Sequence, residues 1–401
     1  MKKLTVIIVN YNVKHYVEQS LISLYRAMGD IDAEIYVVDN NSSDNSIPYL
    51  RKRFKRVNFI NSHHNLGFAR ANNLVIRQTE SEYVLLLNPD TFVGEDVIVE
   101  AVNFMDAHPQ AGALGVKMLK SDGTRAMESR RGLPTPRVAF YKMVGLCARY
   151  PQNRKYGQYY MGYLPWEEPA RIEVISGAFM MIRRQALEEV GGGLDEDYFM
   201  YGEDIDLSYC LLKNGYENWY LPVNVLHYKG ESTQKSSFRY IHVFYDAMLI
   251  FMRKHYGNKT FLFSIPVKTA IYMKALVALM KMQLTKLRDN LGFISRNRQE
   301  EPFFIFIGNK SSIDHCRRLV KTNALEAVFF VGNEETMPEG HKMLDEKLFA
   351  RTTPIYVVYD IDAYTFTKVL SLFENNPRSN VALGTYNHRH RILITAEEIY
   401  Q

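Results

Sequence analysis

The chain has 401 residues, of which 47% are hydrophobic and 23% are charged, and its formal net charge is +5. This length suits two or three domains, and the apolar content supports packed cores and excludes a chain that is disordered throughout. The small net charge predicts no nucleic-acid partner, and three cysteines without metal-site or disulfide spacing fit a reducing compartment.

Strands and helices alternate in the first part of the chain. The first apolar run is too short for a signal peptide, because Asn10 and Asn12 interrupt it, and no uninterrupted apolar run reaches the roughly 18–20 residues that span a bilayer. The alternation predicts a mostly parallel sheet covered by helices. The expected strands are 4–9, 34–39, 57–61 and 83–87, and the expected helices are 16–28, 46–54, 68–78 and 96–108.

The middle of the chain has weaker periodicity. Residues 121–169 are rich in Arg, Tyr, Gly and Pro, and we predict long loops near the functional site. A buried strand is expected at 174–184, followed by a short helix at 185–190 that ends at three glycines. After a cluster of acidic residues, a further helix is expected at 207–214.

Residues 240–291 are predicted to form two helices divided at Pro266. On the second helix Lys274, Lys281 and Arg288 recur every seven residues and therefore share one face. A basic amphipathic helix of this kind is typical of contact with an anionic membrane surface. The alternative is a helix that packs on the rest of the protein with its lysines in solvent.

A second alternation of strands and helices follows at 303–401. It predicts a small α/β domain, and its strands lack the Gly-rich loop that cradles a phosphate. A structural or partner-docking module is the simplest interpretation of this domain. The expected strands are 303–308, 327–333, 354–360 and 381–386, and the expected helices are 316–321, 343–349 and 366–373.

Two acids end strands of the first predicted sheet, where ligands of parallel sheets bind. Asp39 is placed to accept a hydrogen bond from a ribose or a base, although it could also be an ordinary turn residue. Asp90, which follows Asn88 and a proline, is placed to hold Mg²⁺ or Mn²⁺ against substrate phosphates, although it could instead cap the next helix. The two acids are expected to share one crevice.

Three further acids crowd together at Glu203, Asp204 and Asp206. Crowded carboxylates raise at least one pKa, which suits a general base, but acids are also favoured at any helix start. His227 follows an apolar strand and could be a metal ligand or a structural histidine.

The order of the motifs NYN, VVDNNSSD, NLGFARANN, LLLNPD, SGAFMMIRR, GEDIDL and HYKGES, over about residues 3–235, resembles the family 2 glycosyltransferases of the GT-A fold. Within that family the sequence is similar to the rhamnosyltransferase-like branch of bacterial surface polysaccharide synthesis. The resemblance implies a Rossmann-like mixed sheet with helices on both faces in a catalytic domain at 1–235. A helical segment at 236–300 and the small domain at 303–401 complete the expected organisation.

The resemblance also implies roles for individual residues. Asp204 would be the catalytic base beside Glu203, and Asp90 and His227 would lie at the metal. Asn88 stands where the family often has an acid, so metal affinity is expected to be weaker. The nucleotide-sugar would contact Val9, Asn10, Asn12, Asp39, Asn65, Gly67, Asn72, Asn88 and Gly177.

The predicted activity is inverting transfer from a UDP- or dTDP-sugar, with dTDP-rhamnose as one candidate donor. The expected acceptor is a saccharide, lipid-linked, at the inner face of the cytoplasmic membrane. One alternative is a catalytically inactive nucleotide-sugar-binding protein with an interaction module. Nucleotidyl transfer is disfavoured, because that chemistry needs a Gly-rich basic loop where this chain has NYNVKHY.

Overall fold

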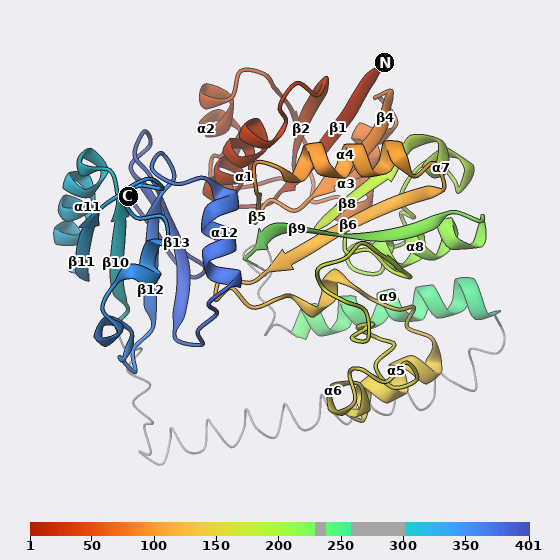
Figure 1. Ribbon diagram of the computed structural model, residues 1–401. Coiled ribbons are helices and arrows are strands. Elements are labelled where there is room, and N and C mark those ends of the chain that lie inside the picture. The colour runs from red at the N-terminus through yellow and green to blue at the C-terminus, as the bar shows by residue number, and fades with distance from the viewer. Residues whose placement is uncertain (229–237, 258–300) are drawn as a thin grey trace, which may run out of the picture.

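The computed structural model describes residues 1–228, 238–257 and 301–401, which form two sheets and their helices (Figure 1). In order across the first sheet, its strands are β3 (Val57–Asn61), β2 (Ala33–Asp39), β1 (Lys2–Asn10), β4 (Ser81–Leu87), β8 (Phe179–Arg183), β6 (Ala111–Leu119), β9 (Glu217–His227) and β5 (Thr91–Val93). A further strand, β7 (Ala170–Ile172), pairs with β9.

This first sheet is mixed, as the resemblance implies. Strands β3, β2, β1 and β4 run parallel, whereas β8 runs antiparallel to both β4 and β6. The helices around it are α1 (Lys14–Ala27), α2 (Ser46–Arg53), α3 (Gly67–Ile76), α4 (Val97–Ala107), α7 (Arg184–Glu189) and α8 (Glu203–Lys213).

Helices cover both faces of the sheet, so its central strands are apolar on both sides. In β1, Leu4, Val6 and Ile8 join one core cluster with side chains of α1, α2 and α4. Ile7 and Val9 alternate with them and join a second cluster with side chains of α3, α7 and α8. This double burial explains the continuous apolar run of the first strand.

Some predicted elements differ from the observed ones. The loops expected at 121–169 contain three short helices, η1 (Met127–Ser129), α5 (Pro136–Met143) and α6 (Leu146–Arg149). The strand expected at 174–184 is regular only in β8, since the backbone of Arg131 pairs with Val174 just before it. Helix α8 begins at Glu203, earlier than expected, because its first-turn acids suit a helix N-terminus.

Residues 301–401 form a second sheet with its own helices, which we call the C-terminal unit. Its strands in order are β11 (Glu326–Val331), β10 (Phe303–Gly308), β12 (Ile355–Asp360), β13 (Val381–Asn387), β14 (Ile392–Ile394) and β15 (Ile399–Tyr400). Its helices are α11 (Lys310–Thr322) and α12 (Phe366–Glu374), and the helix predicted at 343–349 is replaced by two short 3₁₀ turns, η3 (Gly340–Met343) and η4 (Glu346–Phe349).

The C-terminal unit packs tightly on the first sheet. Helix α12 contacts both β9 and β5 and lies between the two parts in Figure 1. Side chains of β10, β12 and α12 belong to the same apolar cluster as α1 and α4. The Tyr16 hydroxyl donates to the Thr395 carbonyl at 2.9 Å, and the Gln19 amide donates to the Thr385 hydroxyl at 2.6 Å. The unit is therefore integrated into the protein rather than tethered to it.

Helix α9 (Phe238–Tyr256) lies beside α8 and confirms a helix in the first part of the segment expected at 240–291. The predicted second helix, with its basic face of Lys274, Lys281 and Arg288, falls outside the described residues. Within the ranges that are described, no helix combines the length and apolarity needed to cross a membrane.

The start of α12 depends on one carboxylate that precedes α4 in the first part of the chain. Glu95 accepts from the backbone N–H groups of Phe366 at 2.9 Å and Thr367 at 2.8 Å. A helix N-terminus leaves such donors without intrahelical acceptors, and an anion there also complements the helix dipole. This contact anchors α12 at the junction of the two sheets.

We predict that Glu95→Ala lowers the free energy of unfolding by about 1–2 kcal/mol, because two N–H groups of α12 lose their acceptor. Urea unfolding of the variant and the wild type measures the difference. Glu168→Ala, at an exposed carboxylate in the loop before β7, is the matched control and should change stability by less than about 0.5 kcal/mol. Equal unfolding of all three proteins contradicts the role given to Glu95.

Candidate functional site

The paired ends of β1 and β2 carry the first group of predicted site residues. Asn10 and Asp39 are directly opposite in the register, and the Asn10 amide donates to Asp39 at 2.6 Å. The other Asp39 oxygen accepts from the Ser42 backbone N–H at 2.9 Å. Both Asn10 and Asp39 are buried, as is the preceding Val9. A carboxylate fixed in this way is oriented before any ligand arrives.

Turn residues connect this strand end to the start of α3. Asn12, with φ +58°, accepts from the Ser43 backbone N–H at 2.7 Å. Asn40 donates to the Gly67 carbonyl at 3.1 Å and accepts from the Leu66 N–H at 2.9 Å. The β1 and β2 ends and the α3 N-terminus are thus held together.

Helix α3 begins under the loop that leads to α8. Asn65 accepts from the Gly67 N–H at 3.0 Å, and Gly67 has φ +77°. A Cβ on Gly67 would lie 2.2 Å from the Phe199 carbonyl oxygen, so a side chain there is excluded. Asn72, one turn further along α3, is buried and its side-chain oxygen has no hydrogen-bond partner among the described residues.

The Asn-Pro-Asp turn after β4 meets the end of β9. His227 Nε2 lies 3.3 Å from Asp90 Oδ1 and 3.3 Å from the Asn88 side-chain nitrogen. Asp90 is buried, and His227 Nδ1 is a buried nitrogen without a hydrogen-bond partner in the described part of the chain. A carboxylate, an imidazole and a side-chain amide that converge in this way fit a divalent cation whose other ligands come from a substrate.

Asp204 lies in the first turn of α8 and faces the backbone of Gly177. The Gly177 N–H donates to Asp204 Oδ2 at 3.3 Å, and the Arg131 guanidinium donates to the same oxygen. Two left-handed residues, Tyr201 with φ +68° and Gly202 with φ +89°, precede the helix. Tyrosine rarely adopts this conformation, and strain of this kind concentrates at functional sites.

Arg131 is a site residue that the sequence did not single out. Its guanidinium also donates to the Ile175 carbonyl at 3.1 Å. Burial alone would lower the pKa of Arg131, but the Asp204 carboxylate, with Tyr159 and Glu128, raises that pKa above its ordinary value. The sequence contains one signal for it, the adjacent arginines Arg130 and Arg131 in a stretch predicted to form loops near the site. Without helical or strand periodicity, the sequence does not indicate which of the two side chains points toward the site.

Glu203 stands beside Asp204 in a different environment. Burial, and then the neighbouring Asp204 charge, raise the pKa of Glu203 to about 8. One of its side-chain oxygens has no hydrogen-bond partner among the described residues. At neutral pH Glu203 is therefore protonated, whereas the Asp204 carboxylate forms an ion pair with Arg131.

The segment at Gly177 brings these groups to one edge of the sheet. The Asn88 N–H donates to the Ala178 carbonyl at 3.0 Å, which ties the Asp90 turn to the segment that contacts Asp204. A Cβ built on Gly177 would be 3.6 Å from the Asp204 Cβ and 3.6 Å from the Phe68 ring at the start of α3. The structure thus brings the predicted residues together around the carboxyl ends of β1, β2 and β4.

A second polar cluster surrounds Asp206 on the other side of α8. Potential ligand atoms of Asp206, Cys210 and His255 lie within 4.8 Å of one another. The Lys254 ammonium, however, donates to Asp206 at 2.8 Å and to Asp195 at 2.5 Å. Because the Lys254 ammonium already supplies the positive charge, this cluster fits an ion-pair network that joins α8 and α9 better than a metal site.

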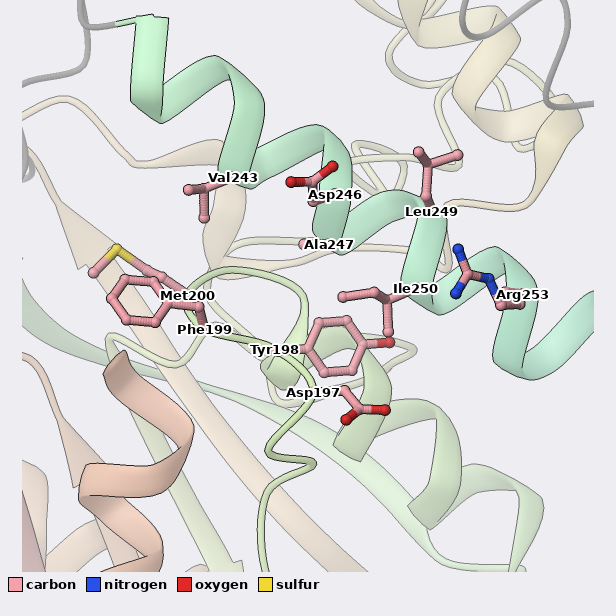
Figure 2. Close-up of a pocket in the computed structure, with 10 residues that line it drawn as sticks. All are labelled: Asp197, Tyr198, Phe199, Met200, Val243, Asp246, Ala247, Leu249, Ile250 and Arg253. Carbon is pink, nitrogen blue, oxygen red and sulfur yellow. The ribbon is translucent and has the colours of Figure 1, made fainter. Parts of the chain in front are cut away.

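A hollow of about 520 Å³ opens between α9 and the loop before α8. Figure 2 shows Phe199 and Met200 of the loop across from Val243 of α9, with Ile250 and Arg253 further along the helix. Phe199 is 40% exposed, although its backbone carbonyl accepts from the Phe68 N–H at the start of α3. One wall of this mostly apolar hollow is therefore the loop that leads into α8, the helix whose first turn contains Asp204.

Comparison with known proteins identifies relatives of the chain. The model of glycosyl transferase family 2 matches residues 5–191. The chain is 30% identical over 268 residues to an N-acetylglucosaminyl-diphospho-decaprenol L-rhamnosyltransferase of Mycobacterium tuberculosis, covering 64% of this chain and 85% of that protein. It is 24% identical over 263 residues to rhamnosyltransferase WbbL of Escherichia coli, covering 59% and 91%. A crystal structure of Staphylococcus aureus TarS is 20% identical, covers 62% of this chain and 64% of that one, and gives a TM-score of 0.43.

The Glu203 environment predicts a pH-dependent stability. In the folded chain Glu203 keeps its proton up to about pH 8, whereas its ordinary pKa is 4.5. Between these values the folded state binds more protons than the unfolded state, so stability falls as pH rises. The glutamine of Glu203→Gln is neutral at every pH in this range, so the variant does not show this fall in stability. Its stability relative to wild type should rise, by up to about 1.4 kcal/mol per pH unit across this window.

Urea unfolding of the variant and the wild type at about pH 5 and about pH 8 measures this difference. Glu188→Gln, at an exposed position on α7, is the control and should show no such trend. A Glu203→Gln difference that is the same at both pH values contradicts a protonated Glu203.

Proposed function

Because the chain belongs to the family 2 glycosyltransferases, in their rhamnosyltransferase-like branch, we propose that it transfers one sugar, with inversion, from a UDP- or dTDP-sugar to a saccharide acceptor. The observation that carries this proposal is the Asp204 carboxylate, held by Arg131 and the Gly177 N–H beside the Asn88–Asp90 turn. Sugar transfer needs a proton acceptor next to a site for the leaving diphosphate.

The nucleoside end of the donor is proposed to bind at the ends of β1 and β2. Asp39 is oriented by Asn10 and Ser42 and can accept from a ribose hydroxyl or a base N–H. The turn at Asn12 and the start of α3 at Gly67 flank this position. A pocket fixed by its own hydrogen bonds loses little conformational freedom when the donor binds.

The diphosphate is proposed to bind beside Asp90. The Mg²⁺ or Mn²⁺ ion would be held by the side chains of Asp90 and His227 and by the side-chain oxygen of Asn88. When bound, such an ion would neutralise charge that develops on the departing diphosphate. Asn88 contributes no charge, so Asp90 supplies the negative charge of this ligand set. The close approach of Asp90 and His227 supports the assignment.

Asp204 is proposed to be the general base. It accepts the proton of the acceptor hydroxyl while that oxygen forms a bond to the anomeric carbon, on the face opposite the leaving group. The bond from the anomeric carbon to the diphosphate breaks, and the nucleoside diphosphate leaves with the electron pair. Arg131 orients Asp204, and the buried Glu203, neutral at pH 7, adds no second negative charge to the turn.

The acceptor is proposed to be lipid-linked and to approach through the hollow beside α9. The name of the relative from Mycobacterium tuberculosis includes N-acetylglucosaminyl-diphospho-decaprenol, a saccharide linked to a lipid. In this chain Phe199, Met200 and Ile250 give the hollow an apolar lining next to the Asp204 turn. A lipid-linked acceptor implies action at the inner face of the cytoplasmic membrane as a peripheral protein.

Asp204→Asn is expected to reduce transfer by about 10²–10⁴-fold, because the isosteric amide cannot accept the proton. Release of UDP or dTDP from sugar donors, in the presence of a lipid-linked acceptor, measures transfer, and calorimetry with the free nucleotide measures donor-site binding. Binding should be retained in the variant. Asp30→Asn, at an exposed position in the turn between α1 and β2, is the matched control.

Full transfer by folded Asp204→Asn protein removes Asp204 from the mechanism. Nucleotide binding by the wild type without nucleotide release, across a panel of donors and acceptors, instead favours the inactive binding protein.

Asp90→Asn tests the metal assignment. Mn²⁺ should tighten UDP or dTDP binding to the wild type, and the variant should lose about 10–100-fold of metal-dependent affinity because Asp90 is the charged ligand. Titration calorimetry with and without Mn²⁺ measures the effect. Asp30→Asn again serves as control, and an unchanged Mn²⁺ effect in Asp90→Asn places the ion elsewhere.

A further inference from the structure

A second hollow, of about 400 Å³, lies between α1, the end of α2 and the C-terminal unit, away from Asp204. We refer to it as the junction pocket. It is lined mainly by cationic and aromatic side chains, namely Tyr25, Arg26, Arg53, Phe54, Arg389 and His390. Among the described residues that line it, Asp362 is the acidic one.

The junction pocket joins two basic runs from distant parts of the sequence. Residues 51–56 read Arg-Lys-Arg-Phe-Lys-Arg, and residues 387–391 read Asn-His-Arg-His-Arg. Arg53 and Phe54 of the first run and Arg389 and His390 of the second line the same hollow. Gathering like charges opposes folding unless an anion is available to neutralise them.

Internal partners neutralise only part of this charge. Glu18, a buried residue of α1, lies 3.5 Å from Arg53 Nε and also pairs with His390. Asp362 lies 3.4 Å from Arg26 and 3.9 Å from Arg389. The Arg389 side chain remains 80% exposed. Three arginines therefore share two carboxylates with a histidine, which leaves a net positive pocket.

The position of the pocket in the fold also suits a ligand. Ile361 and Asp362 follow the carboxyl end of β12, and Asn387 ends the neighbouring parallel strand β13. Ligands of parallel α/β sheets bind beyond such strand ends, and pockets are frequent where two structural units meet. Tyr25 is 40% exposed and stacks on Phe54, with ring centroids 5.9 Å apart.

We propose that the junction pocket binds a phosphate-bearing anion. Planar guanidinium groups match phosphate oxygens in a bidentate way, which favours arginines over other cations for this task. The exposed Tyr25 ring offers an apolar surface to whatever group carries the phosphate. A soluble phosphate ester and a lipid headgroup supply the same chemistry. This site is separate from the proposed catalytic site and does not depend on the sugar-transfer proposal.

Arg389→Glu tests the proposal, because this exposed side chain can be reversed without removing a core contact. Calorimetry with inorganic pyrophosphate and the full chain, with EDTA present, should show at least about tenfold weaker binding in the variant. Lys321→Glu, an equal charge reversal at the exposed end of α11, is the matched control and should bind as the wild type does.

A parallel sedimentation assay uses vesicles of phosphatidylglycerol and of phosphatidylcholine. Pyrophosphate binding that depends on Arg389 supports a soluble ligand. Binding that depends on Arg389 but occurs only on phosphatidylglycerol vesicles supports a lipid headgroup as the source of the phosphate. Equal binding by the wild type and Arg389→Glu in both assays overturns the proposal, whatever the outcome of the transfer assays.

Discussion

Arg131 and Asp204 form an ion pair whose side chains are only 15% and 14% exposed, so each charge depends on the other inside the protein. Arg131 also donates to the Ile175 carbonyl, and Asp204 also accepts from Gly177. The pair therefore fixes the start of α8 relative to the segment before β8. Through the hydrogen bond from Asn88 to Ala178, that segment in turn fixes the Asp90 turn. The proposed base and the proposed metal ligand keep their relative positions because of this one chain of contacts.

The C-terminal unit extends the same framework instead of forming an independent module. Its sheet shares an apolar cluster with α1 and α4, and Glu95 of the first part holds the start of α12. Helix α1 begins just after the Asn10–Asn12 turn and contributes Tyr25 and Arg26 to the junction pocket at its other end. One helix therefore links the proposed donor site to the proposed anion site. An anion bound at the junction pocket would stabilise the docked arrangement of the two parts by mass action.

Much of this organisation could be predicted from the sequence, for identifiable reasons. The apolar strands β1, β2 and β4 and the acids that end them follow from local pattern and the rules of parallel sheets, and the family assignment is confirmed. Arg131 and the junction pocket could not be predicted, because each is made by contacts between residues far apart in the chain. Short strands such as β5 and β14 were also missed, since three residues carry too little periodicity. The roles of Asp39, Asp90 and Asp204 stay predictions until a ligand is observed.

A crystal structure of the protein with UDP or dTDP and Mn²⁺ tests the central claim most directly, since that claim is spatial. We predict the nucleoside against Asp39, the diphosphate and the ion between Asp90 and His227, and the Asp204 carboxylate facing the position of the sugar. A nucleotide bound at another surface, with the Asp39 and Asp90 side chains still engaged only with protein atoms, would contradict the account.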